Sequence, residues 1–340
     1  MRRGEAILQR PPLMKDIRIG VIGIGHLGNY HLQKYRNLEG CVITAVADVI
    51  EDKAFRAAEQ YDCRPCSDHR DLLGTVDAVS IAVPTPSHYE TAKTFLDAGV
   101  HVLLEKPITV ALHEADELIA VAEKNRALLQ VGFVERFNPA VIALAKVIDK
   151  PLFIEAHRLH PFFERGTDVD VILDLMIHDL DIILHFVNSP IEAIDAVGVS
   201  VLSEQVDIAN VRLRFKTGCV ANITASRVTG KTMQKIRFFG IEGYHAVDYS
   251  KRELVSLSKK QGEKGKLDII SNAVDVIQHD PLEEEIRSFV DSVRNNSTPL
   301  VTGRDGRDAL ELALNISGEM EKAKARMGAD LLIDIQRQCR

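Results

Sequence analysis

Apolar runs alternate with amphipathic stretches over the first 135 residues. The apolar runs lack the polar alternation of a strand with one solvated face, so they predict buried strands, at 17–22, 42–47, 78–83, 101–104 and 128–134. The amphipathic stretches predict helices, at about 26–38, 51–60, 87–98 and 111–125. Strands that alternate with helices in this way predict a doubly wound, parallel α/β sheet.

The rhythm changes near Arg136. Strand-like segments then follow one another without long helices, which predicts an α+β domain with an open, mostly antiparallel sheet, at 152–160, 191–202, 206–215, 218–228, 233–239 and 244–249. A short helix is expected around 139–147 and a longer one at about 168–187. The charged segment 258–266 predicts an exposed loop. Two final helices are expected, one opening at Pro281 and one at 307–326.

These patterns divide the chain into two domains between two terminal segments. Residues 1–13 show no periodicity and predict a flexible arm. A nucleotide-binding domain is expected at 14–135 and a substrate and oligomerisation domain at 136–327, whose last helices can pack back on the first domain. Residues 328–340 are expected to form a tail.

Charge and hydropathy narrow the class of protein. The formal net charge of −7 argues against nucleic-acid and anionic-membrane partners. No apolar stretch approaches the ~20 residues of a membrane span, so a cytoplasmic location is expected.

Five cysteines do not suggest a disulfide framework. Cys63-Arg64-Pro65-Cys66 has the spacing of a redox or metal motif, but no second pair of ligands follows it. We therefore interpret it as a structural loop and predict no metal site.

A glycine motif closes the first apolar run. Gly23-Ile24-Gly25-His26-Leu27-Gly28 lies between a predicted strand and a predicted helix. Glycines there let main-chain N–H groups and the positive helix end approach a pyrophosphate. The motif predicts a dinucleotide-binding loop.

An acid follows at the expected distance. Asp48 ends the second strand, where a carboxylate can accept both ribose hydroxyls and would repel a 2′-phosphate. This favours NAD over NADP. A second interpretation makes Asp48 a helix cap, and the two roles are compatible.

After the third long strand, Pro84, Thr85 and His88 are candidates for the nicotinamide side, although Pro86 and Ser87 could simply begin a helix.

Glu105-Lys106-Pro107 ends the fourth long strand, at the edge where a cofactor would lie. A lysine in a partly desolvated cleft has a lowered pKa and can relay a proton or polarise a hydroxyl. Lys106 is the first catalytic candidate, and Glu105 is expected beside the cofactor.

Asp174 and His178 form a second constellation. On a helix the i, i+4 spacing puts both on one face, with Asp181 further round. Histidine titrates near neutrality and can take a hydroxyl proton while the aspartate orients it or binds substrate. A salt-bridged surface pair is the alternative interpretation.

Together, these motifs resemble the Gfo/Idh/MocA oxidoreductase superfamily over roughly residues 16–327. The resemblance implies an N-terminal Rossmann domain, a C-terminal domain whose open sheet often forms the subunit interface, and hydride transfer between NAD(P) and a sugar or polyol carbon. It implies that Lys106 contacts nicotinamide and substrate, that His178 is the acid/base and that Asp174 assists it.

Residues 131–139 and the helix around His178 are similar to the UDP-N-acetylglucosamine 3-dehydrogenase branch, although many family members have histidine where this chain has Phe133. That branch implies a 3-keto nucleotide sugar and an aminotransferase that converts it towards lipid A or surface polysaccharide. A dehydrogenase of a free sugar or inositol is the alternative, and a silent NAD-binding regulator is a third. A homodimer or homotetramer is expected. Cations should meet the diphosphate, and the candidate substrate-binding residues are Arg136, Asn138, Arg158, His160, Arg165, Arg227 and Lys231.

Overall fold

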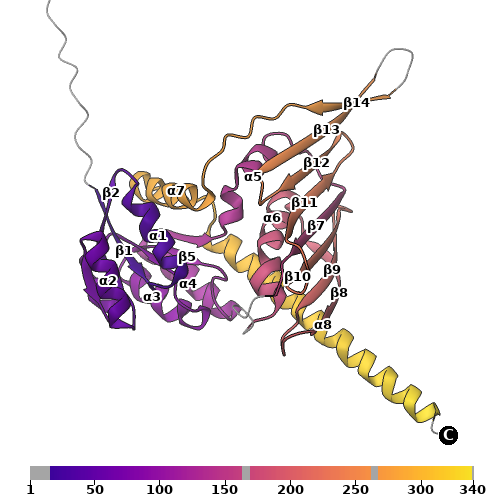
Figure 1. Ribbon diagram of the computed structural model, residues 1–340, viewed down its shortest axis with the longest axis horizontal. Coiled ribbons are helices and arrows are strands. Elements are labelled where there is room, and N and C mark those ends of the chain that lie inside the picture. Colours follow the sequence, from indigo (N-terminus) through magenta and orange to yellow (C-terminus); the bar gives the residue numbers. More distant parts are fainter. Residues whose placement is uncertain (1–15, 163–168, 262–266, 339–340) are drawn as a thin grey trace, which may run out of the picture.

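The structure, a computed structural model, describes residues 16–162, 169–261 and 267–338, with side chains described up to residue 325. The chain forms two sheets that lie side by side (Figure 1). A six-stranded sheet flanked by helices occupies the N-terminal part. An eight-stranded sheet, covered by helices on one face, occupies the C-terminal part.

All strands of the first sheet run parallel, in the order β3-β2-β1-β4-β5-β6. The predicted parallel sheet is confirmed, with one extra short strand, β3, that the apolar pattern missed. The strand order reverses between β1 and β4, and ligands of such sheets bind at the carboxyl ends around this point. The strands are β1 (Ile17–Ile22), β2 (Cys41–Ala47), β3 (Arg64–Cys66), β4 (Ala78–Ile81), β5 (His101–Glu105) and β6 (Leu129–Gly132).

The helices of this domain lie on both faces of the sheet, because its strands are apolar on both sides. One buried cluster joins β1 and β2 to α1 and α7, and another joins β4, β5 and β6 to α3, α4 and α8. The predicted helices are α1 (His26–Arg36), α2 (Glu51–Tyr61), α3 (His88–Asp97) and α4 (Leu112–Asn125).

The second sheet has the order β14-β13-β12-β11-β7-β10-β9-β8 and is antiparallel except for the β7–β10 pair. Buried and exposed residues alternate along β9, as expected for a sheet with one packed face. Helix α6 (Ile177–Val187) lies against the packed face. The strands are β7 (Phe153–Leu159), β8 (Ile191–Val199), β9 (Ile208–Phe215), β10 (Val220–Ser226), β11 (Met233–Phe239), β12 (Gly243–Asp248), β13 (Glu253–Gln261) and β14 (Leu267–Asn272).

The loop predicted at 258–266 is wrong over its first residues. Strand β13 continues to Gln261 and pairs with β14, whose Ile269 and Ile270 lie opposite Lys259 and Ser258. This hairpin lies at the end of the sheet (Figure 1). Its strands are exposed and carry lysines, so the hydropathy of the segment resembled that of a loop. Residues 262–266 lie outside the described residues.

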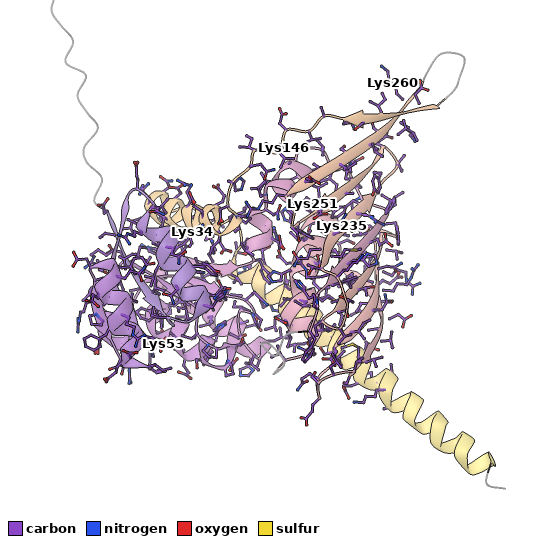
Figure 2. The ribbon with its side chains drawn as sticks, viewed as in Figure 1. Lys34, Lys53, Lys146, Lys235, Lys251 and Lys260 are labelled. Atoms are coloured by element: carbon purple, nitrogen blue, oxygen red, sulfur yellow. The ribbon has the colours of Figure 1, made fainter. Side chains whose placement is uncertain are left out.

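The last two helices return towards the first domain. Helix α7 (Pro281–Asn295) begins at Asp280, whose side chain accepts a hydrogen bond from the Glu283 amide. The helix packs against α1, and Lys34 of α1 lies 3.2 Å from the Asp280 carboxylate (Figure 2). Helix α8 (Gly303–Gln338) packs against α4, α6 and β8 and then continues beyond the sheet (Figure 1). It is longer than the predicted 307–326, and most of the expected tail is helical.

Cys66 ends β3, and Cys63 lies in the loop directly before that strand, so the predicted loop is in part a short strand. Cys63 and Cys66 are free thiols, and burial raises the pKa of Cys63 to about 11. A thiol with a raised pKa is a poor nucleophile and a poor metal ligand, which favours the structural interpretation. Within the described ranges, no helix combines the length and apolar composition that crossing a bilayer requires.

Candidate active site

The glycine motif forms the turn between β1 and α1. Gly23 has a φ of +87°, and its amide donates a 2.8 Å hydrogen bond to the Ala47 main-chain oxygen. A Cβ atom on Gly28 would lie 1.9 Å from the Gly23 oxygen, so α1 approaches the turn too closely for a side chain. A Cβ atom on Gly25 would meet nothing within 4 Å. The Gly25 main chain therefore faces open space, as a pyrophosphate-binding loop requires.

That open space belongs to a cavity of about 640 Å³ at the carboxyl ends of β1, β2 and β4. Its walls combine apolar side chains with main-chain amides of the glycine turn, which fits a dinucleotide. The lining includes Gly23, Gly25, His26, Leu27, Asp48, Val49, Ile50, Lys53, Ser67, His69, Pro84 and Ser87.

Asp48 joins the glycine turn to the second strand. Its carboxylate accepts 2.7 Å and 2.9 Å hydrogen bonds from the amides of Ile24 and Ile50. The Ile50 bond makes Asp48 a cap-like residue at the start of α2. A carboxylate has about four acceptor positions, so two remain for ribose hydroxyls and the predicted ribose contact stays compatible with the cap-like bond.

His88 is buried in the domain and does not line the cavity. The side chain is 1% exposed, and its two ring nitrogens lie 2.8 Å and 3.0 Å from the main-chain oxygens of Pro107 and Val83. His88 thus ties the loop after β4 to the loop after β5. The nicotinamide contact expected of His88 is not supported by this position. Thr85 is half-buried at the short turn Thr85–Ser87 and is not among the cavity-lining residues.

Lys106 extends from the end of β5 towards the second domain. Its ammonium donates a 2.7 Å hydrogen bond to the Asp174 main-chain oxygen and lies 3.8 Å from the Asp174 carboxylate. Burial lowers the pKa of Lys106, while the Asp174 and Glu105 carboxylates partly oppose that decrease. The lysine is therefore held at the boundary between the two domains.

Asp174 and His178 are separated by a change of helix type. Residues Ile172–Met176 form a π-helical turn, after which α6 begins. No hydrogen bond joins Asp174 to His178 among the described residues, and the expected Asp174–His178 pair is replaced by an Asp174–Lys106 pair.

His178 is poised as a neutral imidazole. Its Nδ1 is buried without a hydrogen-bond partner among the described residues, and its ring packs edge-on at 6.1 Å from the Phe133 ring. Burial, followed by the charges of Lys106 and Arg158, holds the pKa of His178 well below the ordinary 6.5. A neutral imidazole with a free nitrogen can accept a proton.

Two arginines expected at the diphosphate instead form buried ion pairs. Arg158 binds Asp179 through two bonds of 2.8 Å and 3.2 Å and also binds Glu135 at 3.0 Å. Arg136 binds Asp181 in the same forked manner, at 2.7 Å and 3.0 Å. Both guanidinium groups are almost fully buried. Their charges are already balanced, so the predicted diphosphate contact is not supported for either.

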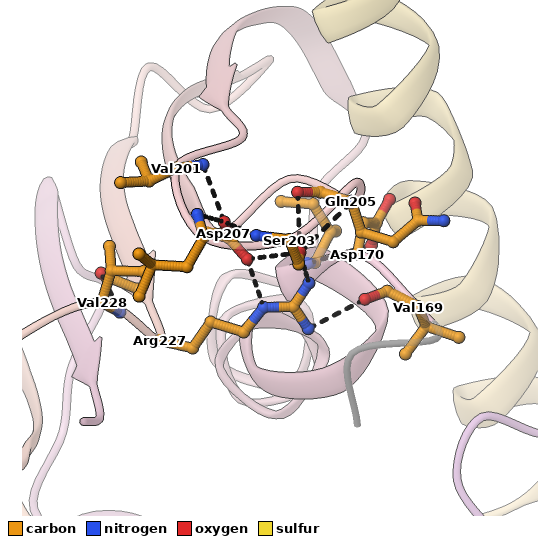
Figure 3. Close-up of polar contacts among 11 residues, drawn as sticks. Val169, Asp170, Val201, Ser203, Gln205, Asp207, Arg227 and Val228 are labelled. Carbon is orange, nitrogen blue, oxygen red and sulfur yellow. Dashed lines mark hydrogen bonds and ion pairs between the residues drawn. The ribbon is translucent and has the colours of Figure 1, made fainter. Parts of the chain in front are cut away.

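Arg227 also forms a buried ion pair with a carboxylate (Figure 3). Its guanidinium donates to Asp207 at 2.8 Å and to the Val169 main-chain oxygen at 3.0 Å. The Asp207 carboxylate also accepts bonds from the amides of three loop residues, Val201, Leu202 and Ser203. Arg227 therefore fastens the loop before β9 to the segment that leads into the π-helical turn. This role corrects the substrate-binding prediction.

The remaining substrate candidates are divided. Asn138 is 2% exposed and caps helix α5 (Pro139–Leu144), so it is also structural. His160 follows β7, half-buried, with Nε2 2.6 Å from the Gln234 amide nitrogen. Lys231 is exposed. Arg165 lies outside the described residues.

Comparison with known proteins identifies the family. The profile described as "Oxidoreductase family, NAD-binding Rossmann fold" matches residues 17–133, and the profile of the "GFO/IDH/MocA C-terminal domain" matches residues 147–245. The chain belongs to the Gfo/Idh/MocA oxidoreductases.

Several Gfo/Idh/MocA relatives span nearly the whole chain. A UDP-N-acetylglucosamine 3-dehydrogenase of Acidithiobacillus ferrooxidans is 37% identical over 313 residues, covering 91% of this chain and 98% of the relative. A solved structure of that enzyme from the same organism matches with a TM-score of 0.83 and covers 91% of this chain and 99% of its own. A myo-inositol 2-dehydrogenase of Thermotoga maritima is 28% identical and covers 91% of this chain and 98% of the relative.

These similarities confirm the predicted fold, the NAD cofactor and the assignment as a sugar dehydrogenase. The Gfo/Idh/MocA site also contains residues that the sequence did not single out. Glu135, Asp179 and Tyr249 surround Arg158, whose guanidinium lies 4.8 Å from the Tyr249 ring centre. Asp179 and Asp181, which follow His178 on an apolar helix, were the sequence signal for these residues, because buried acids require cationic partners.

Proposed function

We propose that this enzyme oxidises a secondary hydroxyl of a nucleotide sugar, C3 of UDP-N-acetylglucosamine, to the 3-keto sugar with NAD as the oxidant. The observation that carries the proposal is the Lys106–Asp174 contact beside a neutral His178, at the edge of the sheet that holds the cavity. The near-full-length similarity to a UDP-N-acetylglucosamine 3-dehydrogenase supports the choice of substrate.

The chemistry divides between two side chains. NAD, held by the glycine turn and Asp48, supplies the hydride acceptor. The protonated Lys106 polarises the substrate oxygen, and the free ring nitrogen of His178 takes the hydroxyl proton. Asp174 holds Lys106 in place through its main-chain oxygen and supports the lysine's positive charge through its carboxylate. Partial burial of both groups limits the access of water to the proton.

The diphosphate requires cations other than the buried arginines. Arg136, Arg158 and Arg227 are each matched to carboxylates, so turning one towards a phosphate would leave a buried acid unpaired. Arg165 and Lys231 remain the candidates from the original set. Within the proposal, the three buried arginines build the substrate domain, and Arg165 and Lys231 bind the diphosphate.

The same proposal includes the biological setting. A 3-keto sugar nucleotide is a substrate for an aminotransferase, which leads towards a diamino sugar of lipid A or surface polysaccharide. These reactions place the enzyme in the cytoplasm. The outer face of the eight-stranded sheet, which no described helix covers (Figure 1), supports a homodimer or homotetramer. Light scattering coupled to size-exclusion chromatography would measure the oligomer.

The second candidate is a dehydrogenase of an inositol or free sugar. The similarity to a myo-inositol 2-dehydrogenase over nearly the whole chain favours it. It uses the same Lys106 and His178 chemistry but needs no cations for a diphosphate. The two functions therefore differ in substrate binding rather than in mechanism.

The test is NADH formation with UDP-N-acetylglucosamine, UDP-glucose, myo-inositol and glucose. An aminotransferase with glutamate as the amine donor removes an unfavourable ketone. Turnover restricted to UDP-N-acetylglucosamine, with inhibition by UDP, supports the proposal. Turnover only with inositol or glucose, without inhibition by UDP, contradicts the substrate and supports the second candidate. Lys106→Met is the control for contaminating dehydrogenases.

A further inference from the structure

A buried carboxyl group lies near Glu105, the residue before Lys106, and has no hydrogen-bond partner among the described residues. Glu285 of α7 is fully buried, and neither of its carboxyl oxygens has a hydrogen-bond partner among the described residues. An ionised carboxylate in that condition would be strongly disfavoured. A group this deeply buried avoids the cost by keeping its proton.

The carboxyl group of Glu285 faces a second acid. One oxygen of Glu285, one oxygen of Glu105 and one ring nitrogen of His31 all lie within 4.8 Å of one another. The three residues come from α7, β5 and α1. The cluster therefore forms where α7 packs against the first sheet. Its member from β5, Glu105, directly precedes Lys106 in the sequence.

The other members of the cluster are already paired. His31 Nε2 lies 2.9 Å from Glu105, and His31 Nδ1 lies 3.2 Å from the Ser80 hydroxyl, which is 2.8 Å from the Tyr35 hydroxyl. With a neutral His31, the donors run in one direction from Tyr35 through Ser80 and His31 to Glu105. In this arrangement Glu105 is the acceptor at the end of the chain, a position that favours its ionised form.

The pKa shifts of the two acids agree with a protonated Glu285 and an ionised Glu105. Burial and the nearby Glu105 charge raise the pKa of Glu285 well above its ordinary value. Burial would raise the pKa of Glu105, but the His31 hydrogen bond and the charge of Lys106 outweigh it and lower that pKa. The titratable groups around Glu285 are thus Glu105, His31 and Tyr35, with Lys106 and His88 beyond Glu105.

We propose that Glu285 is a positioning residue for the reaction: its protonated carboxyl group lies within 4.8 Å of Glu105 and keeps the Glu105 carboxylate charged and fixed next to Lys106. An ionised Glu285 would repel Glu105. An apolar residue would leave Glu105 without the proton that faces it. In both cases the strand end that carries Lys106 would lose its support. This inference rests on the catalytic role proposed for Lys106.

A proton explains the cluster better than a metal ion. A metal bound by these three residues would need the Glu105 oxygen and the His31 nitrogen to face it. Those atoms lie 2.9 Å apart and satisfy each other through a hydrogen bond, which a metal ion would have to replace. Stoichiometric metal in the purified enzyme, measured by elemental analysis, would overturn the proposal.

Three variants test the positioning role. Glu285→Gln keeps the shape and an N–H donor of the neutral acid, so kcat should stay within about twofold of the wild type and the pH profile should not move. Glu285→Leu fills the space without a donor, so kcat should fall about tenfold or more, with NADH binding and melting temperature retained. Glu284→Gln, a partly exposed neighbour, is the control. Equal loss in the glutamine variant, or full kcat in the leucine variant, would overturn the role.

Infrared spectroscopy tests the proton without turnover. Enzyme labelled with ¹³C-glutamate should show the carbonyl band of a buried protonated acid at neutral pH, and this band should disappear in Glu285→Gln. Its absence from the wild type would overturn the proposal. The band does not depend on any substrate. A failed substrate assay with the band present would therefore contradict the proposed function and leave the protonation of Glu285 supported.

Discussion

The ammonium group of Lys106 donates a 2.7 Å hydrogen bond to the main-chain oxygen of Asp174. This bond joins the end of β5 in the first domain to the π-helical turn of the second. The partner atom belongs to the main chain, so a substitution of Asp174 changes the charge near Lys106 without removing the bond.

Lys106→Met should lower kcat by about 10²- to 10⁴-fold, the usual contribution of a positioned proton donor. NAD binding should change little, because the residues that line the cavity are elsewhere. Stopped-flow kinetics and NADH fluorescence would measure the two effects. A similar loss of NAD affinity and of turnover would indicate that Lys106 acts in cofactor binding alone.

Asp174→Asn should move the pH profile. The Asp174 carboxylate raises the pKa of Lys106, so its removal lowers that pKa further. A protonated Lys106 is lost as pH rises through its pKa, and the descending limb of kcat/KM should therefore shift to lower pH. An unchanged limb would contradict the role of Lys106 as the protonated donor. Asp195→Asn, on the outer strand β8, is the control.

His178 should remain a competent base in mild acid. A base must be neutral to accept a proton, and the pKa of His178 lies well below the ordinary 6.5. The activity of the wild type should therefore not fall as pH drops through 6.5. His178→Gln should lower kcat by about 10²- to 10⁴-fold at every pH. An ascending limb centred at the ordinary histidine value would contradict the buried, neutral state.

Two glycines of one motif should respond differently to alanine. Gly25→Ala places a methyl group in the open cavity, so the protein should fold normally but bind NAD about tenfold or more weakly. Gly28→Ala places it 1.9 Å from the Gly23 oxygen and should destabilise the domain itself. Isothermal titration and thermal melts would separate the two outcomes. Normal NAD affinity in Gly25→Ala would indicate that the pyrophosphate does not approach this residue.

The sequence predicted the first domain well because its signals are local. Apolar runs marked β1, β2, β4, β5 and β6, and the turn glycines fixed the position of the cavity. Strand β3 was missed because three residues, one of them Pro65, carry no periodic signal. Strands β13 and β14 were missed because an exposed, lysine-bearing hairpin has the composition of a loop.

In the second domain, residue type alone did not predict which groups the arginines and Asp174 contact. Arginines near a cleft suggested phosphate binding, but burial and partner choice depend on contacts between segments far apart in sequence. Arg158 meets Asp179 and Glu135, each about 20 residues away, and Arg227 meets Asp207. Asp174 likewise meets Lys106 of the other domain, and no spacing rule for helices contains that contact.

The Asp207–Arg227 pair should contribute to stability in a pH-dependent way. Hydrogen bonds from Ser203, from loop amides and from Arg227 outweigh burial and hold the pKa of Asp207 well below the ordinary 3.8. An acid with a lowered pKa stabilises the fold above its ordinary value and loses that contribution as pH falls. Arg227→Met should cost about 3–5 kcal/mol at neutral pH, because it leaves a buried carboxylate without its positively charged partner. Arg214→Met, at an exposed pair, should cost less than about 1 kcal/mol. Urea unfolding would measure both. The difference between the two variants should shrink as pH falls below 3.8, and a constant difference would show that Arg227 stabilises the fold by packing alone.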